Sequence, residues 1–176
     1  MVIYFLRHAS AGEPFDSPKK DEKRGLDKEG IEQCGVVGRF LAAADVQVDA
    51  IVSSPLKRAA QTAFLVGNEM GFDGKIQMES ALRPSGSFAD FRVLLEKNKK
   101  YEAILAVGHN PNLSEFVGKI ISVSGCEAAV DLKKGAVARV ELRRNSGELL
   151  WCVTPRVLRV LYSTAAESVR PKSSRK

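Results

Sequence analysis

Histidine, cysteine and long apolar runs are all scarce in this sequence, and each shortage excludes a class of protein. No apolar run approaches the roughly 18 residues that a membrane-spanning helix needs, so no membrane span is expected. The apolar stretch 1–6 is too short and has the wrong flanks for a signal peptide, and it is expected to form a buried first strand. The three cysteines, Cys34, Cys126 and Cys152, have neither metal-ligand nor redox spacing, so we expect buried, reduced thiols in the cytoplasm.

Charge is unevenly distributed along the 176 residues, which carry a formal net charge of +6. The segment 156–176 has six basic residues and one acid, so it holds +5 and the rest of the chain is nearly neutral. With 44% hydrophobic residues, the chain is expected to form a single domain over 1–155. We expect 156–176 to be a basic C-terminal extension, partly helical or disordered. It is not expected to bind nucleic acid, because it lacks interleaved aromatic and basic residues.

Short apolar runs alternate with longer helical patterns, which predicts an α/β fold with a mostly parallel central sheet flanked by helices. Strands are expected at 2–6, 49–53, 75–78 and 103–107, followed by an antiparallel hairpin at 136–142 and 149–153. Helices are expected after Asp27, from Ser54-Pro55, at 88–95, from Asn110-Pro111 and at 157–162.

The first predicted helix follows a polar segment, 10–24, that is expected to be a loop. In this helix Ile31, Cys34, Gly38 and Leu41 recur at helical spacing. They are therefore expected to share one buried face.

Two histidines, His8 and His109, are all that the chain contains, and they occupy equivalent places in the predicted fold. His8 follows the first strand, and His109 follows the strand that ends at Val107. In open α/β sheets ligands bind at the carboxyl ends of the strands, so two histidines at this edge favour a functional site. Arg7 precedes His8, and Arg58 lies in the first turn of the helix after the second strand, from which its side chain reaches the same edge.

Arginine and histidine together at this edge predict a pocket for a phosphate-like dianion. Guanidinium groups bind phosphate oxygens with paired hydrogen bonds, and the helix starts near Ser54 and Asn110 add main-chain donors and a favourable dipole. A metal site is the competing interpretation. We reject it, because neither histidine has a Cys, Asp or Glu at ligand spacing and the two arginines would repel a cation.

Three segments resemble, in order and spacing, the signatures of the histidine phosphatase superfamily, which has the phosphoglycerate-mutase-like fold. They are Leu6-Arg7-His8-Ala9, the segment 53–63, and Val107-Gly108-His109-Asn110-Pro111. The resemblance covers residues 1–153 and implies a three-layer sandwich in which 1–155 is the catalytic domain, with no metal and no cofactor.

Within the superfamily the chain is most similar to the SixA-type bacterial phosphohistidine phosphatases. The segment between Met78 and Tyr101 is too short for the large helical insert that mutases carry over the pocket. The segment 82–86 also resembles its SixA-type counterpart. This branch therefore predicts an open site without a covering insert.

Two positions depart from the superfamily pattern. Ala9 replaces the signature glycine, a change associated with the SixA-type branch. The glutamate that many members use as general acid after Leu82 is not evident, because Arg83 and Pro84 stand there. Glu79 is near in sequence, although a solvated carboxylate is the favoured interpretation of it.

The resemblance assigns roles to the residues at the strand ends. His8 is expected to be the nucleophile that accepts the phosphoryl group, and the oxygens of that group are expected to be held by Arg7, Arg58 and His109. Arg24 and Asn110 are expected to contact phosphate or substrate, although a free surface arginine is an equal interpretation of Arg24.

The missing acid bears on the substrate. An alkyl phosphate leaves as a poor alkoxide that needs a proton donor, whereas phosphohistidine leaves as an imidazole. We therefore expect a phosphatase for protein phosphohistidine, with a phosphorylated protein such as a histidine-containing phosphotransfer domain as partner. The alternatives are a broad phosphatase for small phosphorylated metabolites, a mutase, which needs a closed pocket, and a non-catalytic phosphate-binding module.

Overall fold

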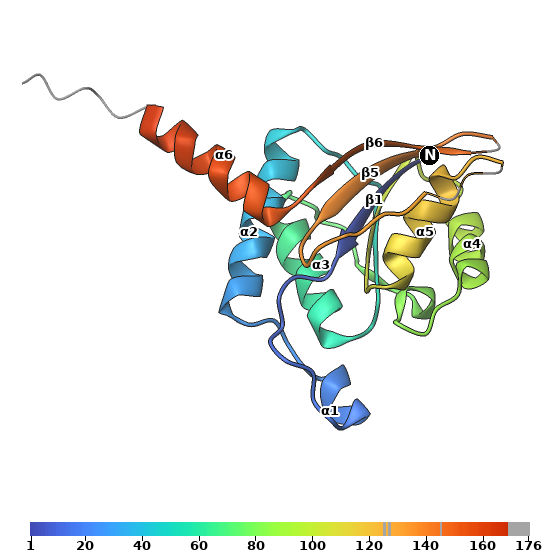
Figure 1. Ribbon diagram of the computed structural model, residues 1–176, viewed down its shortest axis with the longest axis horizontal. Coiled ribbons are helices and arrows are strands. Elements are labelled where there is room, and N and C mark those ends of the chain that lie inside the picture. The colour runs from blue at the N-terminus through green and yellow to red at the C-terminus, as the bar shows by residue number, and fades with distance from the viewer. Residues whose placement is uncertain (125, 127, 145, 169–176) are drawn as a thin grey trace, which may run out of the picture.

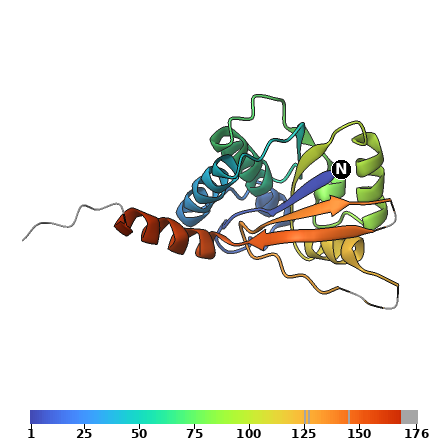
Figure 2. The ribbon, with the colours of Figure 1, turned by 90° about the horizontal axis from the view of Figure 1, so that it is seen from above.

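A six-stranded sheet runs through the centre of the protein, and helices pack on both of its faces (Figures 1 and 2). The computed structural model describes residues 1–124, 126, 128–144 and 146–168. The strands are β1 (Val2–Arg7), β2 (Ala50–Ser53), β3 (Gln77–Met78), β4 (Ala103–Gly108), β5 (Val137–Leu142) and β6 (Gly147–Val153). The helices are α1 (Pro18–Glu22), α2 (Lys28–Ala43), α3 (Lys57–Glu69), the short 3₁₀ helix η1 (Ser80–Leu82), α4 (Phe88–Lys97), α5 (Asn112–Ile121) and α6 (Pro155–Ser168).

The sheet has the strand order β3-β2-β4-β1-β5-β6. The first four strands of this order are parallel, and β5 and β6 continue the sheet as an antiparallel hairpin beside β1. The connection from β3 to β4 holds η1 and α4, with no large helical insert. The predicted α/β fold with a mostly parallel sheet and no insert is therefore confirmed.

Alternation along β1 divides the core into two layers. Ile3 and Phe5 are buried against α4 and α5, whereas Tyr4 and Leu6 are buried against α2 and α3. Successive side chains of a strand point to opposite faces, so an unbroken apolar run is what a strand covered on both sides requires. The result is the three-layer sandwich that the resemblance implied.

Parallel pairing brings the chain segments that follow three strands to one edge. The amide of His8 donates to the carbonyl of Gly108 at 2.9 Å, and the amide of Ser54 donates to the carbonyl of Val107 at 2.9 Å. These two bonds continue the ladder past the ends of β1 and β2. They fix His8, His109 and Ser54 beside one another before any side-chain contact is considered.

Some local predictions need correction. The serine–proline and asparagine–proline pairs predicted helices that start at Pro55 and Pro111, whereas α3 begins two residues later, at Lys57, and α5 one residue later, at Asn112. Asp27 does cap α2, where its side chain accepts a hydrogen bond from the amide of Gly30. Ile31 does not share the buried face of α2, because it is 54% exposed and lines a groove with Phe64.

The segment 10–24 is not wholly a loop, because it contains α1. This short helix has no buried residue and projects from the body beyond the carboxyl end of β1 (Figure 1). The segment 10–24 is rich in charged residues, so apolar periodicity does not predict this helix.

The thiols and the C-terminal segment differ in part from expectation. Cys34 is buried, as predicted, but Cys126 and Cys152 are exposed, and Cys152 lies on the edge strand β6. The extension predicted at 156–176 starts as α6, and 169–176 lie outside the described residues. Among the described residues, no helix is long and apolar enough to cross a membrane.

Candidate active site

His8 stands directly after β1 with its ring orientation fixed by the main chain. Its Nδ1 lies 2.8 Å from the carbonyl oxygen of Ala9, which can only accept a hydrogen bond, so Nδ1 carries the proton. The lone pair of the neutral ring is then on Nε2. Burial, together with the charges of Arg58 and Arg7, lowers the pKa of His8 from 6.5 to about 4. The ring is therefore unprotonated and nucleophilic at neutral pH.

The loop after His8 is held by side chains of the two helices packed below it. The amide of Ala9 donates to Thr62 Oγ1 at 3.1 Å, and the amide of Ser10 donates to Gln33 Oε1 at 2.9 Å. Asp27 accepts from both the Ser10 hydroxyl and the amide of Gly12, each at 2.8 Å. The Ala9 carbonyl that orients the nucleophile is thus part of a hydrogen-bonded loop.

His109 faces His8 with 4.9 Å between the ring centroids. Its Nε2 lies 2.9 Å from the hydroxyl of Ser54, while its Nδ1 is buried without a hydrogen-bond partner among the described residues. The Ser54 hydroxyl also accepts from the amide of Leu56, so its own hydrogen is available to Nε2. We therefore assign the proton of His109 to Nδ1, where it is a free donor.

Burial and the nearby positive charges also keep His109 neutral. Burial is the main cause, followed by His8 and Arg58, and together they lower the pKa of His109 to about 2. Two neutral imidazoles that both carry their proton on Nδ1 therefore lie next to each other, but they turn different nitrogens toward the site. One presents a lone pair and the other presents an N–H group.

Each predicted phosphate-binding arginine is anchored by one corner of its guanidinium. Nη1 of Arg7 donates to the carbonyl of Leu132 at 2.8 Å, and Nη1 of Arg58 donates to the carbonyl of Asp21 at 3.0 Å. The Nε atoms of both arginines are buried without a hydrogen-bond partner among the described residues. Because the guanidinium is planar, anchoring Nη1 leaves the edge formed by Nε and Nη2 for a ligand.

The three unpartnered donors define what the site can bind. Buried polar atoms in proteins are nearly always hydrogen-bonded, so a group of orphaned donors indicates a ligand with acceptors. The donors are Nε of Arg7, Nε of Arg58 and Nδ1 of His109. A phosphoryl group offers three oxygens to such donors, and its phosphorus would then face the lone pair of His8.

Arg24 and Asn110 have their side chains bonded to the protein itself. Arg24 donates from Nε to Asp21 at 2.6 Å and from Nη1 to the carbonyl of Ala11 at 2.8 Å, which leaves its Nη2 for any contact with substrate. Asn110 donates to the carbonyl of Leu132 at 2.9 Å and accepts from Ser114 at 2.9 Å. Asn110 therefore holds the same carbonyl that anchors Arg7.

Sequence reasoning did not find Asp21, nor the roles of the Ser54 hydroxyl and the Leu132 carbonyl. Ser54 lies inside the second signature-like segment, and its position was read as a helix cap. Asp21 belongs to a run of six charged residues at 19–24, in which nothing distinguishes one acid from the next. A main-chain carbonyl such as that of Leu132 leaves no trace in the sequence.

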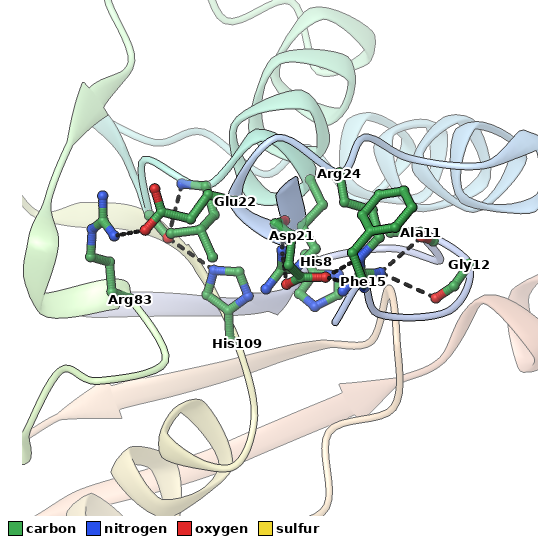
Figure 3. A network of polar contacts seen from close by, with 12 residues as sticks. His8, Ala11, Gly12, Phe15, Asp21, Glu22, Arg24, Arg83 and His109 are labelled. Atoms are coloured by element: carbon green, nitrogen blue, oxygen red, sulfur yellow. Dashed lines mark hydrogen bonds and ion pairs between the residues drawn. The ribbon is translucent and has the colours of Figure 1, made fainter. Parts of the chain in front are cut away.

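Three carboxylates near the site, Asp21, Glu22 and Glu79, lie within ion-pair distance of cations. Asp21 pairs with Arg24 and Arg58. Glu22 pairs with Arg83 at 2.9 Å (Figure 3). Glu79, the one acid considered from the sequence, lies 3.9 Å from the amine of Lys97 and lines a cavity of about 560 Å³. In the part of the chain that the structure describes, none of these acids forms a hydrogen bond or an ion pair with His8 or His109.

Comparison with known proteins identifies the type of site. The family model of the histidine phosphatase superfamily (branch 1) matches residues 3–166. An uncharacterized protein of Picosynechococcus sp. is 30% identical over 171 residues, which cover 90% of this chain and 99% of that protein. The phosphohistidine phosphatase SixA of Escherichia coli is 23% identical over 158 residues, which cover 88% of this chain and 94% of that protein.

Solved structures share the fold. The structure of the protein histidine phosphatase SixA complexed with tungstate has a TM-score of 0.79 and 23% identity, and the match covers 90% of this chain and 99% of that one. An alpha-ribazole phosphatase from Shigella flexneri has a TM-score of 0.66 at 16% identity, covering 88% and 97%. A phosphoglycerate mutase from Bacillus anthracis has a TM-score of 0.65 at 14% identity, covering 90% and 95%.

Proposed function

The chain belongs to the histidine phosphatase superfamily, and we propose that it removes phosphoryl groups from histidine side chains of other proteins. The chain is a phosphatase that acts through a phosphorylated histidine, so the proposal concerns the residues that do this and the substrate that they select. The observation that carries it is a neutral nucleophile, His8, beside orphaned donors of Arg7, Arg58 and His109, with Asp21 and Glu22 paired to arginines.

The first step transfers the phosphoryl group to His8. The lone pair of Nε2 forms a bond to phosphorus while the P–N bond of the substrate breaks, and the departing imidazole takes the electron pair of that bond and a proton from solvent. The Nε groups of Arg7 and Arg58 and the Nδ1–H of His109 bind the three phosphoryl oxygens as charge develops on them. The main-chain carbonyl of Ala9 stabilises the positive charge that His8 gains, because it accepts from Nδ1–H.

The second step returns His8 to its starting state. Water attacks phosphorus, the bond from phosphorus to Nε2 breaks, and inorganic phosphate leaves. The Nδ1–H group of His8 keeps its hydrogen bond to Ala9 throughout. When the bond from phosphorus breaks, the ring of His8 is therefore again a neutral imidazole of the same tautomer. No proton needs to be stored by the protein between the two steps.

The paired carboxylates support phosphohistidine as the substrate. Leaving as an alkoxide requires a proton donor within hydrogen-bond reach. Ion pairing with Arg24, together with a hydrogen bond from the amide of Phe15, lowers the pKa of Asp21, so Asp21 is ionised at neutral pH and cannot donate. An imidazole leaving group needs no such donor from the enzyme.

The proposed partner is a protein that carries phosphohistidine, such as a histidine-containing phosphotransfer domain. The short connection between β3 and β4 supports this, because no covering insert stands between the edge of the sheet and a protein side chain. The cytoplasm is the proposed compartment, since its reducing conditions suit the three free thiols. A small-molecule phosphatase is the second candidate, because Glu79 and Arg83 line one cavity that could hold a small metabolite.

Substrate competition tests the proposal. The purified protein would be offered a phosphohistidine-bearing phosphotransfer domain, p-nitrophenyl phosphate and glucose 6-phosphate at neutral pH, and kcat/KM would be compared. We expect the phosphohistidine protein to be preferred by at least about tenfold, which corresponds to 1.4 kcal/mol in the transition state. Faster turnover of the sugar phosphate would assign the chain to the second candidate.

Intact mass tests the chemistry separately. After brief exposure to phosphoramidate at low temperature, the wild-type chain should gain one phosphoryl group, and His8→Ala should gain none. A gain of the same mass by His8→Ala would place the nucleophile elsewhere.

A further inference from the structure

Asp21 is the point at which two of the arginines near the site meet. Its Oδ1 accepts from Nε of Arg24 at 2.6 Å, and its Oδ2 lies 3.2 Å from Nη1 of Arg58. The same Nη1 also donates to the main-chain carbonyl of Asp21 at 3.0 Å. Figure 3 shows Asp21 in this network together with Arg24. Both the side chain and the backbone of one residue therefore hold the guanidinium of Arg58.

The contact determines which edge of Arg58 remains for a ligand. With Nη1 held at Asp21 and the aliphatic part of the side chain buried in α3, the planar guanidinium has little freedom to rotate. The Nε of Arg58 is then the buried atom left without a partner in the described chain. Arg7 is anchored in the same way, but by the carbonyl of Leu132 and without a carboxylate. Arg58 is thus held both by the main-chain carbonyl and by the charged carboxylate of Asp21.

The negative charge of Asp21 also stabilises Arg58 electrostatically. Burial lowers the pKa of Arg58 and so does the neighbouring Arg24, whereas Asp21 raises it. Two guanidiniums close together repel each other, and the carboxylate between them offsets that repulsion. Without it, Arg58 and Arg24 would separate, and a rotation of Arg58 would carry Nε away from the position of the phosphoryl oxygens.

We propose that Asp21 is a positioning residue for phosphoryl transfer, which acts by holding the guanidinium of Arg58 with its Nε–Nη2 edge open to the phosphoryl group. The proposal rests on the proposed function of Arg58 as a phosphoryl ligand. Asp21 itself does not touch the reacting atoms, and it neither gives nor takes a proton.

Glu22 provides a matched control. It neighbours Asp21 on the same short helix and also forms an ion pair with an arginine, Arg83, but Glu22 is half-exposed and has no contact with Arg58 among the described residues. Asp21→Asn and Glu22→Gln remove the same charge from α1 while keeping the side-chain shape. A difference between them reports the contact with Arg58 rather than the charge of the helix.

The first measurement is the rate at which phosphoramidate phosphorylates His8, followed by quenched intact mass. We expect Asp21→Asn to lower this rate by roughly tenfold or more, the scale of a small misplacement of a transition-state ligand, and Glu22→Gln to change it less than twofold. In a chain that already carries Arg58→Lys, Asp21→Asn should lower this rate hardly any further, because the guanidinium that Asp21 positions is no longer there. Equal rates for the two single variants, or effects that multiply in the double variant, would overturn the proposal.

The second measurement does not depend on turnover. In ¹⁵N-labelled protein below its melting temperature, Asp21→Asn should shift the Nε–H signal of Arg58 and weaken tungstate binding, while the Nε–H signal of Arg7 stays in place. An unchanged Arg58 signal would refute the positioning role even if the variant were less stable. If instead wild-type His8 were never phosphorylated, the proposed function would fail, whereas the signals would still show whether Asp21 holds Arg58.

Discussion

The hydroxyl of Ser54 decides which nitrogen of His109 carries the proton, and its removal gives a sharp prediction. Ser54 is fully buried, and its Oγ lies 2.9 Å from Nε2 of His109. In Ser54→Ala this nitrogen loses its partner inside the protein. A buried acceptor left unsatisfied costs about 1–3 kcal/mol, which for a chain of this size lowers the melting temperature by about 2–4 °C for each kcal/mol.

Ser54→Ala should also slow the phosphorylation of His8, by more than its loss of stability would explain. Once the hydroxyl is gone, nothing favours a proton on Nδ1, and the other tautomer directs a lone pair at the phosphoryl oxygens. Losing one donor of this kind costs roughly 10²-fold to 10³-fold in other enzymes. We therefore expect Ser54→Ala to slow phosphorylation of His8 by about 100-fold, although the hydrogen bond from His8 to the carbonyl of Ala9 is kept.

Ser53→Ala is the matched control. Ser53 is the preceding residue and is equally buried, but its hydroxyl donates to the carbonyl of Ser54 at 3.0 Å and does not touch the histidine. Both variants should lose stability, and only Ser54→Ala should lose rate. ¹⁵N spectra of labelled histidine would report the tautomer directly. If Ser54→Ala phosphorylated His8 as fast as Ser53→Ala, or kept the proton of His109 on Nδ1, the assignment of His109 as a donor would be wrong.

Three further predictions follow from contacts of the same loops. The ring of His8 should titrate by NMR near pH 4, and because its pKa is lowered by folding, the unfolded chain binds more protons between pH 6.5 and 4. His8 alone should therefore lower the free energy of unfolding by about 3 kcal/mol as the pH falls through that window, and His109, whose pKa is lowered further, adds a drop in the same direction. A flat stability profile there would contradict the lowered pKa values. Gly30→Ala should destabilise the protein by about 1–3 kcal/mol in urea unfolding, because the added Cβ would lie 2.0 Å from the carbonyl oxygen of Ser10, and wild-type stability would refute this close approach. Asn110→Ala should slow phosphorylation of His8, because it releases the Leu132 carbonyl that Asn110 and Arg7 share, and a rate equal to wild type would disprove that link.

Strand placement and the histidine pair could be predicted because both depend on simple periodicity. An apolar run before His8 and another before His109 indicated two buried strands, and parallel strands bring their carboxyl ends to one edge. The predicted strands and the observed β1 and β4 differ by a single residue at their ends. The juxtaposition of the two rings followed from this arrangement alone.

The anchors of the site could not be predicted, because they depend on long-range contacts with loops. Arg7 is held by Leu132, 125 residues away, and Arg58 by Asp21, 37 residues away. Asn110 shows the opposite difficulty. Its place in a signature-like segment suggested contact with substrate. In the structure, however, its side-chain amide donates to the carbonyl of Leu132 and accepts from the hydroxyl of Ser114.

The prediction that Ile31 lies on the buried face of α2 was wrong for a different physical reason. Helical spacing identifies residues on similar faces, but the sector of α2 that meets the sheet runs through Gln33, Cys34 and Val37, and Ile31 lies outside it. A polar residue, Gln33, takes a buried place because it bonds the amide of Ser10. Apolar periodicity overlooks a polar side chain that is buried for such a reason.

The position of β1 between β4 and β5 gives the two sides of the site different resistance to local opening. Hydrogen bonds on both sides of β1 mean that its amides exchange with solvent only when most of the sheet opens. The short helix α1 has no buried residue and is held to the body by polar contacts, the ion pairs of Asp21 with Arg24 and Arg58 and of Glu22 with Arg83. The nucleophile therefore follows a strand that is paired on both sides, whereas Asp21 is carried by a short surface helix whose place depends on its ion pairs with Arg24 and Arg58.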